Sequence, residues 1–233
     1  MRILITGAGQ GLGYWLTFVA LQRNHEVYAT VHNLQHISKE LQACAEIFKN
    51  KMHVLEMDVT DEKSVSEVVL CLEEQGAVLD GIVNNAGIII EDKKTIEQLD
   101  LSAMSRSFEV NTIGPMRVIQ RMLPYLYNGD SQVIINVSSE AGTIINAFST
   151  NYPYSMSKTA LNMFTERLRE YLKSKDIFVY AVHPGWMRTN MGGVDAPANP
   201  EDIAKGIVDI LERKKQIFSK IAFIDSTGRP MPL

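Results

Sequence analysis

Short apolar runs recur along the chain, and most are followed by a turn and then by a stretch of helically spaced apolar residues. The runs cover residues 3–5, 27–31, 52–57, 79–83, 132–137, 177–182 and 221–224. Short segments that are apolar at every position are typical of strands buried on both faces of a parallel sheet. Strands that alternate with helices therefore predict an α/β fold, a doubly wound parallel sheet of about seven strands with helices on both faces.

The helical stretches carry signals of their own. Residues 101–127 predict one long helical region that is interrupted around Asn111 and Pro115, because proline removes a hydrogen-bond donor and bends a helix. Asn199 and Pro200 mark the start of a later helix, with asparagine as its cap and proline at its first position. Since no repeat or linker divides the 233 residues, we expect a single domain over residues 1–233.

Composition and charge exclude several classes of function. The formal net charge of −4, without a basic stripe, argues against binding to nucleic acid or to an anionic membrane. The five histidines have no metal-ligand spacing, so we expect no metal site. Cys44 and Cys71 lack CxxC spacing and are expected to be free thiols in a reducing compartment. No apolar run has membrane-spanning length, and the first strand leaves no room for a signal peptide, which predicts a cytoplasmic protein.

A glycine-rich turn joins the first predicted strand to the first predicted helix. Its spacing is Thr-Gly-x-x-x-Gly-x-Gly, formed by Thr6, Gly7, Gly11 and Gly13. Glycine lets a backbone approach a pyrophosphate closely, and a helix N-terminus supplies free N–H groups and positive potential. The spacing fits neither G-x-G-x-x-G nor a P-loop. The turn therefore predicts a phosphate site, with a tight turn that binds no ligand as the alternative.

The end of the second predicted strand bears on the choice of dinucleotide. Dinucleotide-binding folds commonly place an acid there, which holds the 2′-OH of the adenosine ribose. His32 and Asn33 occupy this place instead, and both can donate hydrogen bonds to a 2′-phosphate. This favours NADP(H), with NAD as the second choice. A solvated loop histidine is the alternative interpretation of His32.

Tyr154 and Lys158 are four residues apart in a predicted helix, so their side chains lie on one face of it. A free tyrosine has a pKa of about 10, and a cation roughly 4 Å away lowers that pKa by up to about 3. We therefore expect Lys158 to make Tyr154 a usable general acid and base near pH 7. Taken alone, the spacing is more often that of an ordinary helix, and it gains meaning only beside the other motifs.

Together the motifs resemble those of the short-chain dehydrogenase/reductase family, in the family's order and over nearly the whole chain. The matching residues are Thr6, Gly7, Gly11, Gly13, Asp58, Asn84, Asn85, Ala86, Gly87, Asn111, Ser138, Ser139, Tyr154, Lys158, Pro184 and Gly185. The segment 183–193 is most similar to the branch that contains small carbonyl reductases and C-factor-like proteins. The resemblance implies a Rossmann-type sheet in one dinucleotide-binding and catalytic domain.

The resemblance implies catalytic roles for four residues. Tyr154 is expected to exchange a proton with the substrate oxygen, and Lys158 to bind the nicotinamide ribose and lower the pKa of Tyr154. Ser139 is expected to hydrogen-bond the substrate oxygen, and Asn111 to hold a water that relays protons to Lys158. The interval from Ser139 to Tyr154 is about two residues longer than is usual in the family, which leaves Ser138 as an alternative to Ser139.

The resemblance also implies a cofactor site along one edge of the sheet. The pyrophosphate is expected at the glycine turn, the adenosine near Asp58 and the end of the fourth strand, and the nicotinamide at the segment that begins with Pro184. With His32 and Asn33 included, the expected cofactor-binding residues are Gly7, Gln10, Gly11, Leu12, Gly13, His32, Asn33, Asp58, Val59, Asn85, Ala86, Gly87, Tyr154, Lys158, Pro184, Gly185, Met187 and Thr189.

These residues predict an enzyme that moves a hydride between NADP(H) and a carbonyl or alcohol. The alternatives are a non-catalytic NADP(H)-binding regulator on the same fold, and a lyase or epimerase that uses bound NAD as an internal hydride store. Substrate contacts are expected from Ser139, Ile145, Phe148, Trp186 and Met191. Because this set is mostly apolar, the expected substrate is a small, neutral, partly apolar aldehyde or ketone.

Two predicted helices carry apolar residues beyond the stripes that face the core. These are Met156, Ala160 and Met163 after Tyr154, and Met116, Ile119 and Met122 in the preceding helix. Helices that are apolar on two sides need a partner surface. We therefore expect a homodimer or a homotetramer.

Overall fold

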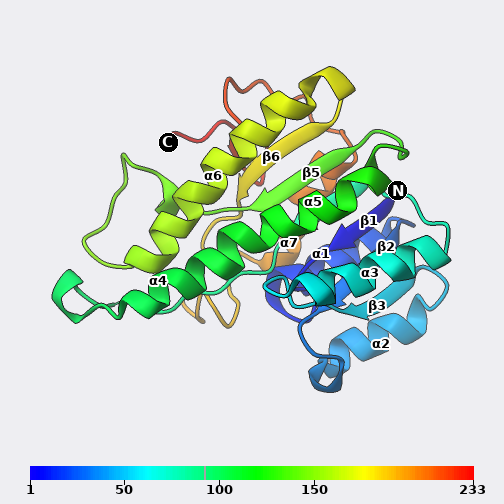
Figure 1. The fold of residues 1–233 in the computed structure, drawn as a ribbon, viewed down its shortest axis with the longest axis horizontal. Helices are drawn as coiled ribbons and strands as arrows, with labels where there is room; N and C mark the ends of the chain where they lie inside the picture. The colour runs from blue at the N-terminus through cyan, green and yellow to red at the C-terminus, as the bar shows by residue number, and fades with distance from the viewer. Residues whose placement is uncertain (92) are drawn as a thin grey trace.

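A single sheet of seven parallel strands runs through the molecule in the computed structural model, which describes residues 1–91 and 93–233 (Figure 1). The strand order is β3-β2-β1-β4-β5-β6-β7, and every pairing is parallel. The strands are β1 (Arg2–Ile5), β2 (Glu26–Val31), β3 (Met52–Glu56), β4 (Gly81–Asn84), β5 (Val133–Val137), β6 (Phe178–His183) and β7 (Phe223–Asp225). The predicted strands and the α/β class are confirmed.

Helices cover both faces of the sheet, and Figure 1 shows α5 and α6 side by side across one of them. The helices are α1 (Gly11–Gln22), α2 (Lys39–Ile47), α3 (Glu62–Glu74), α4 (Leu101–Phe108), α5 (Gly114–Leu126), α6 (Tyr152–Leu172) and α7 (Pro200–Leu211). Along β1, Ile3 and Ile5 pack in the core with α1, α2 and α7, whereas Leu4 packs with α3, α5 and α6. Alternate residues of one strand thus serve two cores, which explains why the run is apolar throughout.

The predicted interruption of the helix over residues 101–127 takes the form of a π turn over Glu109–Ile113, between α4 and α5. Pro115 stands in the first turn of α5, directly after the π turn. Asn111 is buried inside the π turn. A π turn inside a helical region redirects side chains and is frequent at functional sites. The sequence therefore located the interruption but not its geometry.

The structure also bears on the predicted cap of the last helix, on the two cysteines, and on the expectations about membrane helices and metal sites. The side chain of Asn199 accepts a hydrogen bond from the amide of Glu201 at 3.2 Å, which confirms the cap of α7. Cys44 is buried and Cys71 is half-buried, and both are free thiols. Across residues 1–91 and 93–233, no helix is long and apolar enough to span a membrane, and no cluster of His, Cys, Asp and Glu could hold a metal ion. The cytoplasmic location stays a prediction.

Candidate active site

The residues singled out by the sequence gather at one edge of the sheet, where the strands end. β1 leads into the glycine turn, β4 into residues 85–87, β5 into the paired serines, and β6 into residues 184–185. The strand order runs outward in both directions from the β1–β4 pair. Doubly wound sheets bind ligands at this point, outside the carboxyl ends of the strands.

The glycine turn is packed too tightly for side chains at two of its positions. Gly7 has a φ of +65°, and a Cβ there would lie 2.9 Å from the Cα of Ala86. A Cβ on Gly13 would lie 2.1 Å from the carbonyl oxygen of Gly7. At Gly9, in contrast, an added Cβ would meet only Cγ1 of Val31, at 3.5 Å. Glycine at positions 7 and 13 is thus required by the protein's own packing.

The N-terminus of α1 fits a bound phosphate group. Its cap residue, Gln10, makes no side-chain capping bond within the described part of the chain, and the first turn of α1 contains no acid. The first N–H groups of a helix have no partner inside the helix, and their positive potential favours an anion. The Oε1 of Gln10 accepts a hydrogen bond from Asn190 at 2.9 Å, so the segment after β6 reaches this turn.

Thr6 and Asn85 join the glycine turn to the turn after β4. The hydroxyl oxygen of Thr6 accepts hydrogen bonds from the amides of Asn85 and Ala86, at 3.0 and 2.9 Å. The Nδ2 of Asn85 donates to the carbonyl oxygens of Thr6 and Gly7, at 2.9 and 3.1 Å. The side chain of Asn85 is therefore used to hold the glycine turn. It supports the expected cofactor site from behind.

The adenosine end of the expected site centres on Asp58. Its Oδ1 accepts hydrogen bonds from the amide and hydroxyl of Thr60, and its Oδ2 lies 3.4 Å from Nε2 of the exposed His32. Burial alone would raise the pKa of Asp58, but the Thr60 bonds and His32 hold it below its usual value. Asp58 is thus a carboxylate at neutral pH, with His32 beside it.

Two residues at this end were not singled out by the sequence. Glu56, paired in register with Val31, accepts a hydrogen bond from the amide of Leu34 at 2.9 Å. An acid therefore does lie near the end of β2, on the neighbouring strand, although its carboxylate is committed to that amide. Arg117 donates to the carbonyl oxygen of Val59 at 2.5 Å and lies 3.5 Å from Glu109 of the π turn. The sequence does not indicate the role of Glu56 or of Arg117, because each depends on a contact that forms only in the folded chain.

Lys158 is a buried cation. Its Nζ donates to the carbonyl oxygen of Val137 at 2.8 Å and lies 5.6 Å from the centre of the Tyr154 ring. Burial lowers the pKa of Lys158 to about 8, because an ammonium group is poorly solvated there. Burial also raises the pKa of the Tyr154 phenol, and a hydrogen bond with Ser139 counteracts part of that rise. The expected depression of the Tyr154 pKa by Lys158 is not what this structure shows, because burial raises that pKa and the lowering contribution comes from Ser139 instead.

The two serines after β5 point to different partners. Ser138 is buried, and its hydroxyl donates to Oδ1 of Asn162 at 2.5 Å. Ser139 hydrogen-bonds the Tyr154 phenol, and its Oγ also accepts from the amide of Ala141 at 3.2 Å. The loop over residues 144–149, which lies within the longer interval between Ser139 and Tyr154, is exposed. Ser139, and not Ser138, is therefore the serine that lowers the pKa of the phenol.

Asn111 uses its side chain on the protein itself. Its Oδ1 accepts from the amide of Ile88 at 2.8 Å, while its Nδ2 donates to the carbonyl oxygen of Ile88 at 2.9 Å and to Oγ of Ser157 at 3.0 Å. Both N–H bonds of the amide are thus occupied. A Cβ on Gly87 would lie 3.3 Å from Oδ1 of Asn111 and 3.6 Å from Nζ of Lys158. Asn111 therefore anchors the chain that flanks Lys158.

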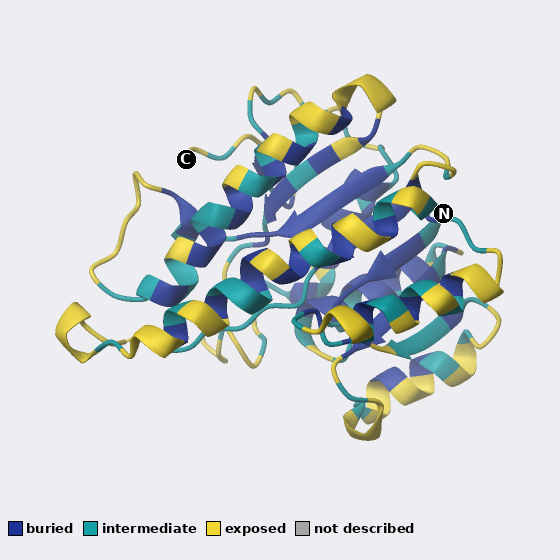
Figure 2. Cartoon of the chain, in the orientation of Figure 1, coloured by how far each residue is buried: buried dark blue, intermediate teal, exposed yellow. Residues whose placement is uncertain are grey.

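Hydrogen bonds from its own side chains hold the segment after β6 in its conformation. The indole N–H of Trp186 donates to the carbonyl oxygen of Gly192 at 2.6 Å, and Arg188 binds the carbonyl oxygens of Ala196 and Pro197. Met187 forms an isolated parallel bridge with Ala198. The apolar side chains expected to contact substrate are all exposed here, as Figure 2 shows for the surrounding loops. These are Ile145, Phe148, Trp186 and Met191.

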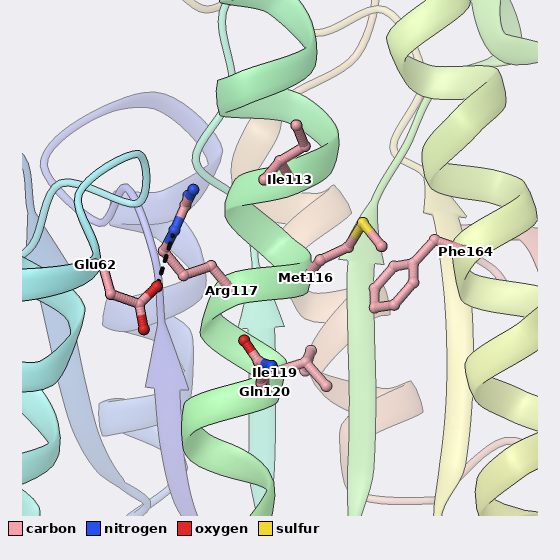
Figure 3. Close-up of a pocket in the computed structure, with 7 residues that line it drawn as sticks. All are labelled: Glu62, Ile113, Met116, Arg117, Ile119, Gln120 and Phe164. Carbon is pink, nitrogen blue, oxygen red and sulfur yellow. Dashed lines mark ion pairs between the residues drawn. The ribbon is translucent and has the colours of Figure 1, made fainter.

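An open groove of about 490 Å³ lies apart from this edge, between α5 and α6 (Figure 3). Its apolar lining residues are Ile113, Met116, Ile119 and Phe164, and Figure 3 shows the side chains of Met116 and Phe164 pointing toward one another. The expectation of a second apolar side on α5 is partly wrong, because Ile119 and Met122 are buried in the core. On α6, Met156 and Met163 are exposed as expected.

A parallel sheet of this strand order, with a glycine turn at its switch point, defines the doubly wound class of dinucleotide-binding α/β proteins. Within that class, the family model described as "short chain dehydrogenase" matches residues 1–199. The chain therefore belongs to the short-chain dehydrogenase family, whose members are oxidoreductases.

Individual proteins show the same relationship. C-signal of Myxococcus xanthus is 32% identical over 155 residues, which cover 66% of this chain and 92% of that protein. Carbonyl reductase Sniffer of D. melanogaster is 29% identical with a TM-score of 0.89, covering 100% of this chain and 99% of that one. The NADPH-bound carbonyl reductase from chicken fatty liver is 27% identical with a TM-score of 0.86, covering 100% and 98%.

Gly13→Ala is expected to destabilise the ligand-free protein by about 3 kcal/mol, because the added Cβ overlaps the backbone of Gly7. Urea unfolding of the purified protein measures this change. Gly9→Ala is the control, since it adds the same methyl group to the same turn, where it makes only an ordinary van der Waals contact with Val31. Equal stability of the two variants would show that the close packing of the turn is not present in solution.

Proposed function

We propose that the protein is an NADP(H)-dependent oxidoreductase that reduces a small, neutral, partly apolar aldehyde or ketone, or oxidises the corresponding alcohol. The observation that carries this proposal is the meeting of Tyr154, Ser139 and Lys158 at the sheet edge next to the glycine turn. A proton donor, a second hydroxyl and a cation at one place are what carbonyl reduction requires. We propose that residues 1–233 form one dinucleotide-binding and catalytic domain.

Several features support NADP(H) as the cofactor, which supplies the hydride when it is bound. The uncapped N-terminus of α1 would hold its pyrophosphate, and Asp58 with Val59 would flank its adenine. His32 and Asn33 would donate to its 2′-phosphate. Oδ1 of Asn33 accepts from the amide of Gln35, but its Nδ2 is a second donor. The chicken carbonyl reductase has NADPH bound, which favours the same cofactor here.

The ionisation of the site suits reduction. Burial keeps the pKa of Tyr154 above its ordinary value, so the phenol carries its proton at neutral pH and can deliver it to a carbonyl oxygen. Ser139 donates a second hydrogen bond to that oxygen. With a pKa of about 8, Lys158 is mostly an ammonium at pH 7, and it stabilises the phenolate that forms. Asn111 holds the flanking chain in place.

The mouth of the site supports an uncharged substrate. Ile145, Phe148, Trp186 and Met191 provide exposed apolar surface on two segments, one after Ser139 and one after β6. The only basic residue of the segment after β6, Arg188, is bound to the carbonyl oxygens of Ala196 and Pro197. No cation of that segment is therefore positioned to bind an anionic substrate. A non-catalytic regulator would need the glycine turn alone, and the Ser139–Tyr154 contact favours the enzyme over it.

Tyr154→Phe should lower kcat for NADPH-dependent reduction by a factor on the order of 10² to 10⁴, because it removes the proton donor and little else. NADPH binding, followed by fluorescence, should persist. Tyr152→Phe, two residues earlier in the same helix, serves as the control and should retain turnover. Full turnover by Tyr154→Phe on the best carbonyl compound of a panel would contradict the proposed role of the phenol.

NADPH should bind at least about tenfold more tightly than NADH, which corresponds to about 1.4 kcal/mol from contacts to the 2′-phosphate. His32→Asp should abolish this preference, because a carboxylate repels the phosphate. His36→Asp places the same charge change on an exposed residue nearby and should keep the preference. Tighter binding of NADH by the unmodified protein would show that the interpretation of His32 and Asn33 is wrong.

We also propose that the protein forms a homodimer or homotetramer through α6 and the α5–α6 groove. Met156 and Met163 expose apolar surface on α6, and Met116 and Phe164 continue it across the groove. Surface of this kind is stabilised by a partner. Association of identical chains through such a patch is usually symmetric, so the same face serves both copies.

Met163→Glu should shift the assembly to monomers in sedimentation velocity experiments, because it places a charge in the proposed interface. Ile47→Glu makes the same kind of change at an exposed residue of α2, on the other face of the sheet, and should leave the assembly intact. A monomeric unmodified protein at micromolar concentration would refute the proposed assembly.

A further inference from the structure

The short turn over Glu140–Gly142, which follows Ser139, is held by α6 on one side. The carbonyl oxygen of Gly142 accepts from the Thr159 hydroxyl at 3.0 Å and from Nδ2 of Asn162 at 3.3 Å. A Cβ on Gly142 would lie 2.7 Å from the carbonyl carbon of Lys158, so the turn and the helix are in direct contact. None of these bonds involves a group that titrates near neutral pH.

On its other side the turn is held by His183, the last residue of β6. Nδ1 of His183 accepts a hydrogen bond from the backbone amide of Glu140 at 3.1 Å. Because a backbone N–H is always the donor, Nδ1 must be unprotonated, and neutral His183 carries its proton on Nε2. Protonation of the imidazole places a hydrogen on Nδ1, and the bond to Glu140 is then lost.

The turn that His183 holds also sets the position of Ser139. The Oγ of Ser139 accepts from the amide of Ala141, the central residue of the turn, at 3.2 Å. A side-chain hydrogen bond from the same residue lowers the pKa of the Tyr154 phenol relative to burial alone. A continuous path therefore leads from His183 through the amides of Glu140 and Ala141 to Ser139 and Tyr154. The imidazole of His183 is the one group that connects to Ser139 in this path and can gain a proton near neutral pH.

We propose that His183 is a positioning residue: its neutral imidazole holds the Glu140–Gly142 turn, and its protonation releases the turn and withdraws Ser139 from Tyr154. This inference rests on the proposed function, since it explains how that same site would lose activity in acid. His183 itself contacts neither of the reacting side chains in the path; it acts through two backbone amides.

The charges around His183 fix the direction of the pH effect. The carboxylate of Glu140 approaches Nε2 at 4.0 Å, and Asp225, paired in register on β7, is the other charged group that acts on the ring. Burial lowers the pKa of His183 below its ordinary value, and the two carboxylates counteract part of that shift. The hydrogen bond is therefore intact at neutral pH and is lost as the pH falls through the lowered pKa. Removing the charge of Glu140 should lower that pKa further.

The first test uses NMR on the ligand-free protein, so that it does not depend on catalysis. The imidazole nitrogen shifts of His183, assigned by their loss in His183→Asn, should show the Nε2–H tautomer at pH 7.5. The Cζ shift of Tyr154 should change along the His183 titration, and Glu140→Gln should move both changes to lower pH. In His183→Asn the Tyr154 change should disappear. An Nδ1–H tautomer, or a Tyr154 shift that ignores the titration, overturns the proposal.

The second test measures kcat at saturating NADPH against pH. The unmodified enzyme should lose activity in acid, Glu140→Gln should move this loss to lower pH, and His183→Asn, whose carbonyl oxygen accepts but does not titrate, should remove it. His183→Leu should give, at every pH, a kcat about 10- to 100-fold below that of the unmodified enzyme at neutral pH, as expected when a reacting group is slightly misplaced. Loss of activity at high pH, which we assign to Lys158 with its pKa of about 8, should be the same in all these variants.

His25→Asn is the matched control, because His25 is a buried histidine that lies immediately before β2, far along the chain from the turn. The His25→Asn variant should lose activity in acid at the same pH as the unmodified enzyme. An acid loss that is unchanged in His183→Asn, or removed by His25→Asn, refutes the role of His183. If no carbonyl compound is reduced at any pH, the proposed function fails, while the NMR measurements still decide whether His183 controls the Ser139–Tyr154 contact.

Discussion

The hydrogen bond from the buried ammonium of Lys158 to the carbonyl oxygen of Val137 fixes the geometry on which the whole site depends. A buried cation without a partner is costly, so this bond sets how α6 is rotated against the end of β5. That rotation turns Tyr154, one helical turn earlier, toward Ser139 at the end of the same strand. The contact between the hydroxyls of Ser139 and Tyr154 thus follows from the position at which the Lys158 ammonium finds its hydrogen-bond acceptor.

A row of buried polar side chains supports the same arrangement across the sheet. Nδ2 of Asn84 on β4 donates to Asn136 on β5 at 2.8 Å, and Asn136 in turn donates to the hydroxyl of Thr165 on α6 at 2.9 Å. Polar groups in such an interior have few other partners, so the row favours one register of helix against strand. One turn nearer the site, Asn162 receives the hydroxyl of Ser138 in the same way. Ser139, the neighbouring serine, thereby stays available for a hydrogen bond with Tyr154.

Sequence reasoning predicted the strands, the glycine turn and the Tyr154–Lys158 pair because each depends on residues close together in the chain. Periodicity is local, and so is the four-residue spacing of a helix face. The direction of the Tyr154 pKa was not predictable in this way, because it is decided by burial, which is contributed by the whole fold. The roles of Arg117 and His183 also depend on backbone groups brought to them from distant segments, and a carbonyl or an amide leaves no mark in the residue pattern.

The same distinction separates the two halves of the site. The half proposed for the cofactor is built from tight backbone, where Gly7 and Gly13 have no room for a Cβ and the Asn85 side chain is committed to two carbonyl oxygens. The half proposed for the substrate is built from exposed side chains such as Phe148 and Trp186, on loops whose length the fold does not fix. Changes at Gly7 or Gly13 disturb folding, whereas changes at an exposed side chain such as Phe148 alter the surface. A chain of this design can therefore change the substrate it accepts while its nucleotide binding stays the same, and its sequence specifies the cofactor far more narrowly than the substrate.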